Sequence, residues 1–180
     1  EEVCGCRETF IKERPLPENP RKKGKVTVDD ATLFMARFEN GALGSFESTR
    51  MAAGRKNYME FEINGSEGSL LFNLERLNEL QYYNRKDSAG HRGFRTILTT
   101  EPTHPYLQAW WPPGHIIGWQ HSFVHQVRDF ILAIEREQPI HPDFYDGVKC
   151  QAVLEAVELS VRKGGWVRPG SLWKDRRKSS

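Results

Sequence analysis

The sequence predicts an α+β fold, in which a large, mostly antiparallel, open-faced sheet is covered on one face by two C-terminal helices. Two observations carry this prediction. The first two-thirds of the chain reads as short strands separated by hairpin signals, and the apolar period then changes from about two residues to about 3.6. Strands followed by helices are typical of the segregated α+β class, and no further element covers the second face of the sheet.

The strongest hairpin signals are two Asn-Gly pairs, Asn40-Gly41 and Asn64-Gly65. Glycine supplies the positive φ that a tight hairpin turn needs. Each pair lies between two segments that alternate between apolar and polar residues, so each is expected to join two antiparallel strands. The expected strands are residues 3–11, 31–38, 42–49, 58–63, 69–72, 79–83 and 94–99.

The last third of the chain has helical periodicity. Apolar residues from Phe123 to Ile134 fall on one helical face, and a second helix opens near Asp143 and ends at Gly164. The Lys-, Arg- and Pro-rich residues 18–25 are expected to form a polar loop. We treat residues 1–180 as one domain, because this length can bury one core, and we expect residues 170–180 to form a flexible tail.

Composition excludes several classes of function. The formal net charge is only +2, which argues against nucleic acid as the main partner. No apolar run is long enough for a membrane span, and no signal peptide is recognisable. Cys4, Cys6 and Cys150 do not have the spacing of a redox or zinc site, so we expect reduced thiols and a cytoplasmic protein.

The sequence contains no motif that predicts a catalytic, cofactor-binding or metal-binding residue. Its Gly-rich segments are hairpin turns with no helix after them, so they cannot form a dinucleotide phosphate loop. His121 and His125 share a helical face, and two histidines at this spacing can bind a metal. No third ligand is recognisable, however, and one polar and one structural histidine is the preferred interpretation.

Residues 110–121 are the most informative segment for function, because they combine Trp, His, Gln, Pro and Gly. Aromatic rings pack on the C–H faces of sugars, and imidazoles and amides bind hydroxyl groups. The alternative interpretation, an aromatic plug that seals the core, is left open by composition. The loop that carries Arg50 and Asn57 follows an expected strand, where ligand contacts and solvated surface charge are both common.

Several segments together resemble the C-terminal domain of the glucose–fructose oxidoreductase, inositol dehydrogenase and rhizopine-catabolism (Gfo/Idh/MocA) family of oxidoreductases. The resemblance covers nearly the whole chain, and it depends on the order and spacing of the segments. They are VDDA at 28–31 with RFENGALGSFE at 37–47, FEINGSEGSL at 61–70 with LERLNEL at 74–80, PPGH at 112–115 with GWQHSF at 118–123, and PDF at 142–144 with DG at 146–147 and WV at 166–167.

The resemblance implies an oxidoreductase that transfers hydride between a CH–OH group of a sugar or polyol and NAD or NADP. Family members bind the cofactor on an N-terminal Rossmann domain, which also carries the catalytic Lys. The family's Asp and His pair precedes the position where this chain begins. The chain is therefore expected to be a substrate-binding and oligomerisation fragment that lacks the Rossmann domain, binds no cofactor alone and is inactive alone. Homo-oligomers are expected to form through the open sheet face.

The residues expected to contact the substrate are Arg50, Asn57, His115, Trp119 and His121. Two other functions remain open at the level of the sequence. The chain could be a stand-alone sugar-binding or dimerisation module. It could also belong to an enzyme of the same family that recycles NAD while cleaving glycosides.

Overall fold

The structure, a computed structural model, describes residues 1–171, so most of the expected tail lies outside the described residues. The described chain has the α+β architecture that the sequence predicts, with antiparallel sheets first and two long helices towards the C-terminus. It divides into two compact units. One comprises Glu1–Ala53 with the residues from His141 onwards, and the other comprises Gly54–Ile140.

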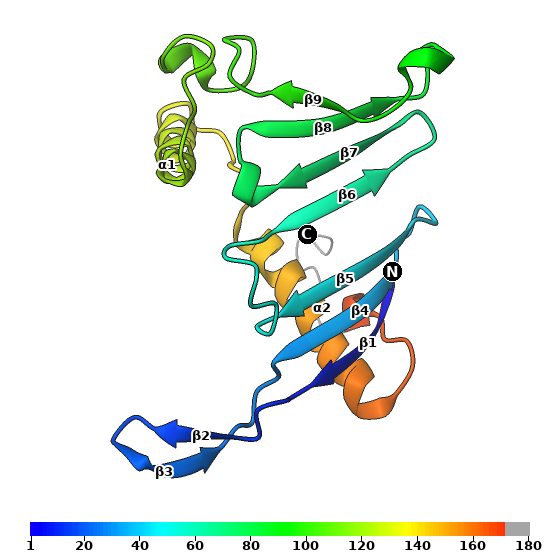
Figure 1. Ribbon diagram of the computed structural model, residues 1–180, viewed down its shortest axis with the longest axis vertical. Coiled ribbons are helices and arrows are strands. Elements are labelled where there is room, and N and C mark those ends of the chain that lie inside the picture. The colour runs from blue at the N-terminus through cyan, green and yellow to red at the C-terminus, as the bar shows by residue number, and fades with distance from the viewer. Residues whose placement is uncertain (172–180) are drawn as a thin grey trace. The chain divides into compact units, whose positions relative to one another are not determined.

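The first unit contains a three-stranded antiparallel sheet with the order β1-β4-β5 (Figure 1). Asn40-Gly41 lies in the turn between β4 and β5, where Gly41 has a φ of 85° and its N–H donates to the Phe38 carbonyl. The hairpin prediction is therefore confirmed. The strands are β1 (Glu2–Glu8), β4 (Ala31–Arg37) and β5 (Leu43–Thr49).

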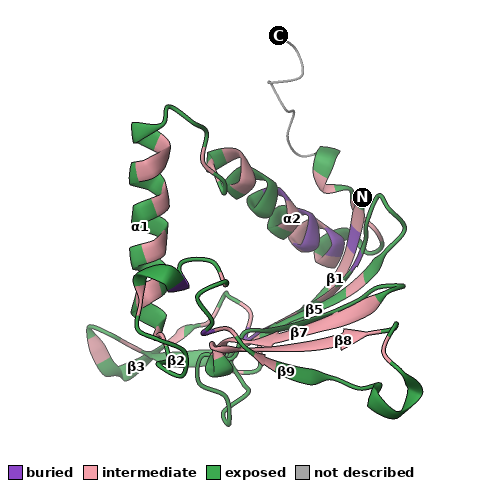
Figure 2. Cartoon of the chain, turned by 90° about the horizontal axis from the view of Figure 1, so that it is seen from above, coloured by how far each residue is buried: buried purple, intermediate pink, exposed green. Residues whose placement is uncertain are grey.

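Helix α2 (Phe144–Lys163) packs against β1 and forms the core of this unit. Val3, Ala36, Ala156 and Val157 are buried together, and Figure 2 shows the buried residues gathered where α2 lies over β1. Gly5 permits this approach, because a Cβ atom added there would lie 2.9 Å from Cγ1 of Val157. Any larger residue at this position would require the Val157 side chain, the helix or the strand to move.

Ser160 joins α2 to the outer edge of β1. Its buried hydroxyl accepts a hydrogen bond from the Gly5 N–H and donates one to the Gly165 carbonyl. Val167 extends this arrangement, because it exchanges two backbone hydrogen bonds with Val3. The edge of the sheet is thus covered within the unit, which satisfies backbone groups that would otherwise be exposed.

The second unit contains a four-stranded antiparallel sheet with the order β6-β7-β8-β9, followed by the 17-residue helix α1 (Trp119–Glu135). The hairpin predicted at Asn64-Gly65 is also confirmed, because β6 ends at Asn64 and pairs antiparallel with β7, and the Gly65 N–H donates to the Gly68 carbonyl. Gly65 does not adopt the expected positive φ. Neither α1 nor any other helix among the described residues is long and apolar enough to cross a membrane. The strands are β6 (Glu60–Asn64), β7 (Gly68–Asn73), β8 (Glu79–Asn84) and β9 (Arg95–Leu98).

The expectation of a polar loop at residues 18–25 was wrong, because most of these residues form one strand of a β-hairpin. Strand β2 (Glu13–Leu16) pairs with β3 (Asn19–Lys25) around a turn at Pro17. Leu16 packs over Gly24, and a Cβ atom added at Gly24 would lie 2.6 Å from a Leu16 methyl carbon. The hairpin forms by backbone pairing and this one contact. It lacks the alternation of apolar and polar residues from which a strand is normally predicted.

Candidate functional site

The segment between β9 and α1 is held to the sheet of the second unit by Asn78, which directly precedes β8. The side-chain amide of Asn78 donates to the Ile117 carbonyl at 2.8 Å, and its oxygen accepts from the Ile117 N–H at 2.9 Å. Thr100 and Leu107, which belong to this segment, are buried. An irregular loop thus gains fixed contacts from a regular scaffold, which is how many binding loops are positioned.

A cluster of aromatic and histidine rings joins this loop to α1. The indole N–H of Trp110 donates to Nε2 of His125 at 2.8 Å, and the ring of Trp110 meets that of His121 edge-on, with centroids 4.6 Å apart. Tyr106 stacks on His125 at 4.2 Å, and its hydroxyl donates to Asp129 at 2.6 Å. These contacts fix the path of the loop relative to the first three turns of α1.

The start of α1 contacts one ring nitrogen of His121. Its Nδ1 lies 2.9 Å from the Gly118 N–H and 3.2 Å from the Gly118 carbonyl oxygen. The shorter contact, with the N–H, favours a neutral ring that carries its proton on Nε2. His121 therefore offers an N–H donor at Nε2. His125 lies against Tyr106 and Trp110, and His121 also meets Trp110, so one polar and one structural histidine stays a prediction.

His115 offers the opposite hydrogen-bonding group. Its Nδ1 lies 2.8 Å from the Pro112 carbonyl, which can only accept, so Nδ1 carries the proton and Nε2 is an acceptor. Trp119, at the first position of α1, has 57% of its surface exposed and packs edge-on against Phe123. One short segment thus presents a donor, an acceptor and an open aromatic ring.

The other two expected substrate contacts lie elsewhere in the chain. Asn57 lies in an exposed loop of the second unit, where the Glu75 carboxylate accepts from the backbone N–H groups of Lys56 and Asn57 at 2.8 and 3.0 Å. Glu75 thereby fixes the backbone of this loop. Arg50 belongs to the first unit, follows β5, and has an exposed side chain and an N–H bonded to the Asp30 carbonyl.

Burial lowers the pKa of His125 below its ordinary value, and the neighbouring His121 acts in the same direction. The unfolded chain gains a proton at a His pKa of about 6.5, whereas folded His125 gains it only at lower pH. The free energy of unfolding therefore decreases as the pH falls from about 6.5 through the lowered pKa. Protonation would also remove the acceptor for the Trp110 N–H, a bond of about 1 kcal/mol.

We expect a His125→Gln variant to lose less stability than the parent protein when the pH falls from about 7.5 to about 5. The other titratable groups near His125 are His121, Asp129 and Tyr106, and they remain in both proteins, as does the nearby Arg128. The difference between the two proteins, measured by urea unfolding at each pH, therefore isolates His125. If both proteins lose the same stability, His125 is not a partly buried imidazole with a lowered pKa.

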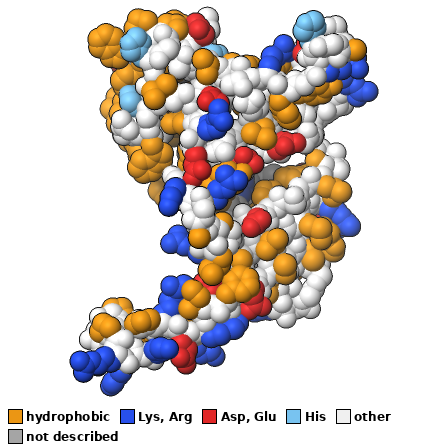
Figure 3. Space-filling view, viewed as in Figure 1, with side chains coloured by type: hydrophobic (Ala, Val, Ile, Leu, Met, Phe, Trp, Pro, Cys, Tyr) orange, Lys and Arg blue, Asp and Glu red, His pale blue; other side chains and the backbone are white. Residues whose placement is uncertain are grey.

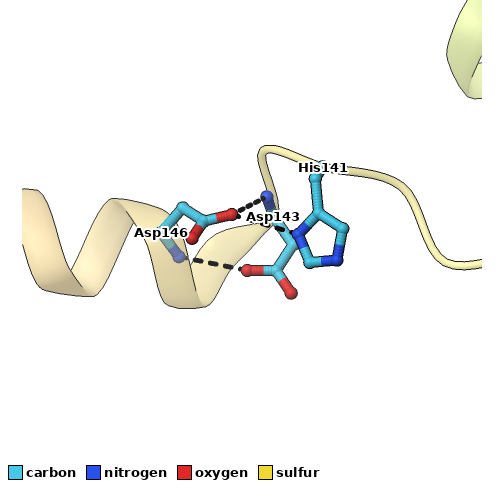
Figure 4. A group of neighbouring side chains, drawn as sticks. All are labelled: His141, Asp143 and Asp146. Carbon is cyan, nitrogen blue, oxygen red and sulfur yellow. Dashed lines mark hydrogen bonds and ion pairs between the residues drawn. The ribbon is translucent and has the colours of Figure 1, made fainter.

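A second group of titratable side chains lies at the start of α2. His141, Asp143 and Asp146 bring one ligand atom each within 4.8 Å of one another, which is a spacing that can hold a metal ion (Figure 4). The Asp143 carboxylate, however, accepts from the N–H groups of Tyr145 and Asp146, and Asp146 accepts from the Asp143 N–H at 3.0 Å. That hydrogen bond, with contributions from Lys149 and His141, holds the pKa of Asp146 well below its usual range. The group therefore forms the N-terminal cap of α2.

The described strands pair only antiparallel, and the hairpin glycines lead into strands rather than helices. These residues do not form the parallel strand–turn–helix unit that binds a dinucleotide, so the cofactor expected from the family does not fit this part of the chain. What the fold and the loop define is an α+β domain with a polar aromatic loop at the start of a helix.

The domain belongs to the oxidoreductase family, Gfo/Idh/MocA, of which the C-terminal alpha/beta domain matches residues 1–168. A levoglucosan dehydrogenase from Pseudarthrobacter phenanthrenivorans is 43% identical over 88% of this chain and 44% of its own length. The chain thus spans less than half of that relative.

Solved structures show the same relationship. An oxidoreductase domain protein from Kribbella flavida is 52% identical, with a TM-score of 0.86 over 92% of this chain and 43% of its own. A levoglucosan dehydrogenase in complex with NADH and L-sorbose is 44% identical, with a TM-score of 0.86 and the same coverage.

Sequence reasoning did not find Trp110, Tyr106 or Asn78 as supports of the loop. Trp110 lies in the aromatic segment that attracted attention, but its partner could not be chosen from composition. The spacing of His121 and His125 was the available signal, because it places both rings on the side of α1 that meets the loop.

Proposed function

We propose that this domain binds the sugar or polyol substrate, and pairs protomers, in an NAD(P)-dependent oxidoreductase that acts on a CH–OH group. The observation that carries the proposal is the set of groups in residues 115–121. His121 offers a donor, His115 an acceptor and Trp119 an exposed ring. A polyhydroxylated ligand needs all three, because each hydroxyl both donates and accepts while the C–H faces are apolar.

The role of these residues in the reaction would be orientation. The nicotinamide cofactor supplies hydride chemistry, and we place its binding site on a Rossmann domain outside these 180 residues. Hydrogen bonds from His115 and His121 would fix the sugar so that one C–H bond faces the cofactor. Arg50 and Asn57, which lie in loops that follow β5, are proposed as further hydroxyl contacts. No proton-transfer step is assigned to a residue of this chain.

Pairing of protomers is proposed to use the sheet face opposite α2. Leu33, Met35 and Leu43 alternate with the residues that face the helix, and all three are exposed. A row of exposed apolar side chains on one sheet face is typical of an interface. Cys4, Cys6 and Cys150 are unpaired, which supports a cytoplasmic location for the enzyme.

The test is to express the reading frame that includes upstream sequence and to screen sugars for reduction of NAD and NADP. Levoglucosan, L-sorbose and inositols form the first panel, because levoglucosan dehydrogenases are among the relatives. We expect one or more of these compounds to increase the absorbance of reduced nicotinamide. Cleavage of a glycoside with no net change in that absorbance would favour the cofactor-recycling alternative. A native polypeptide whose mass matches these 180 residues alone would favour the stand-alone module.

A further inference from the structure

The β2–β3 hairpin, which we call the arm (residues 13–25), has little cover within its own unit. Both strands extend away from β1 and β4 (Figure 1), and most of their residues are exposed. An isolated two-stranded hairpin is only marginally stable in water. An arm of this kind therefore gains stability if it packs on another surface.

The base of the arm is fixed to the first unit by Asp30. Its carboxylate is almost completely buried, accepts from the Ile11 N–H at 2.8 Å and forms an ion pair with Arg14 at 3.4 Å. The Val26 N–H adds a bond to the Lys12 carbonyl at 2.9 Å. A fixed base reduces the conformational entropy that the arm would lose on docking.

The arm is strongly basic, with five basic and two acidic side chains, and Figure 3 shows Lys and Arg gathered over it. Lys23 pairs with Pro15 and Lys25 with Glu13, so both lysines project from the same face of the hairpin. Within the described residues, no carboxylate forms an ion pair with either lysine. The arm thus offers unpaired positive charge to an acidic surface.

The second unit carries a surface of the complementary sign. On one face of the β6–β8 strands, Glu60 lies opposite Asn73 and Glu62 lies opposite Leu71. This acidic face, which we define by β6–β8 and their side chains Glu60, Glu62 and Glu79, contains a hollow of about 280 Å³. Arg76 forms an ion pair with Glu79 at 2.7 Å, so the excess negative charge of the face comes from Glu60 and Glu62. The hollow is lined by Glu60, Leu71, Asn73, Arg76, Glu79 and Gln81.

We propose that the arm of one copy of this chain docks on the acidic face of a second copy, with Lys23 and Lys25 near Glu60 and Glu62. The inference rests on the pairing of protomers proposed above and adds a specific contact to it. A second copy is the favoured occupant because every copy carries both complementary surfaces. In a twofold dimer the contact therefore forms twice. Opposite charges on the two surfaces would also set the register of the pair.

Charge reversal tests the contact in the chain as it exists. One variant carries Lys23→Glu and Lys25→Glu, a second carries Glu60→Lys and Glu62→Lys, and a third combines all four substitutions. Each reversal is expected to raise the dissociation constant of self-association about tenfold or more, and the combination is expected to restore it. Sedimentation velocity at low and high salt measures the effect, and salt is expected to weaken the parent complex.

A matched control reverses the charge of Arg136 and Lys163, which lie at the ends of α1 and α2 and belong to neither surface, and is expected to associate as the parent does. Carbodiimide cross-linking of mixed ¹⁴N and ¹⁵N copies is expected to give mixed-isotope Lys–Glu products between the arm and the acidic face. If the parent associates but neither reversal changes the dissociation constant, or if all products lie within one copy, the arm contact is wrong while pairing stands. If the parent remains monomeric, both proposals are wrong.

Discussion

A Gly68→Ala variant is expected to lose about 3 kcal/mol of unfolding free energy, most of it from the unit that contains β6–β9. Gly68 is the first residue of β7, and it lies opposite Asn84 of β8. A Cβ atom added there would lie 2.4 Å from the carbonyl oxygen of Tyr83. Because this oxygen belongs to the backbone, no rotation of a side chain can relieve the overlap.

The overlap could be relieved only by moving β8 away from β7. That movement would strain the bonds around the turn, where the Gly68 carbonyl accepts from Gly65 and the Glu67 carbonyl accepts from Arg85. The measurement is urea unfolding followed by far-UV circular dichroism. Asn78 precedes β8 and holds the loop that contains Ile117. The Gly68→Ala substitution is therefore also expected to weaken sugar binding in the intact enzyme.

The matched control is Gly65→Ala in the same hairpin. Its added Cβ atom would lie 3.5 Å from the Gly68 carbonyl oxygen, which is an ordinary contact, and Gly65 does not have a positive φ. This substitution is expected to change stability by less than about 1 kcal/mol, because alanine restricts the unfolded chain without a clash. If the two variants lose equal unfolding free energy, the close approach of Gly68 to the Tyr83 carbonyl is not the cause of the loss.

The two hairpins of the sheets could be predicted from sequence because their signal is local. Asn40-Gly41 and Asn64-Gly65 specify tight turns, and the flanking residues alternate between apolar and polar. The arm could not be predicted in the same way. Its strands contain Lys, Arg and Pro in place of alternating apolar residues, and its pairing depends on a turn at Pro17 and on Leu16 packing over Gly24.

The candidate site shows the same division between local and distant information. Residue types on one short segment predicted His115, Trp119 and His121 as polar and aromatic groups for a sugar. Their support could not be predicted, because it comes from residues distant in sequence. Asn78 contacts Ile117 across 39 positions, and Trp110 meets His125 across 15. These partners meet only in the folded chain, where the sheet carries Asn78 and one side of α1 faces the loop.

In the intact enzyme, a His121→Gln variant is expected to raise KM for the sugar about tenfold and to leave kcat nearly unchanged. The Nε2–H of His121 would bond the sugar equally in the ground state and the transition state, so its loss weakens binding without slowing the chemical step. Loss of one such bond costs about 1.4 kcal/mol, which corresponds to a factor of about ten in affinity. Steady-state kinetics with the sugar identified in the screen measures both constants.

The choice of glutamine separates binding from folding. His121 also accepts the Gly118 N–H at the start of α1, and glutamine at the third helical position can accept the same bond. His121→Gln is therefore expected to keep the thermal midpoint of the parent, whereas His121→Ala is expected to lose about 1 kcal/mol of stability as well as affinity. His91→Gln removes an exposed imidazole whose hydrogen bond within residues 1–171 is to Ser88, and it serves as the matched control with unchanged KM.

An unchanged KM in His121→Gln would show that the Nε2–H of His121 does not face the sugar. The imidazole would then serve only to cap α1, and the aromatic cluster around Trp110 would be part of the core rather than the support of a binding loop. A decrease in kcat with unchanged KM would instead place His121 beside the reacting carbon, because only a group that acts in the transition state changes the rate in this way. The same three variants therefore distinguish a capping, a binding and a catalytic role for one imidazole.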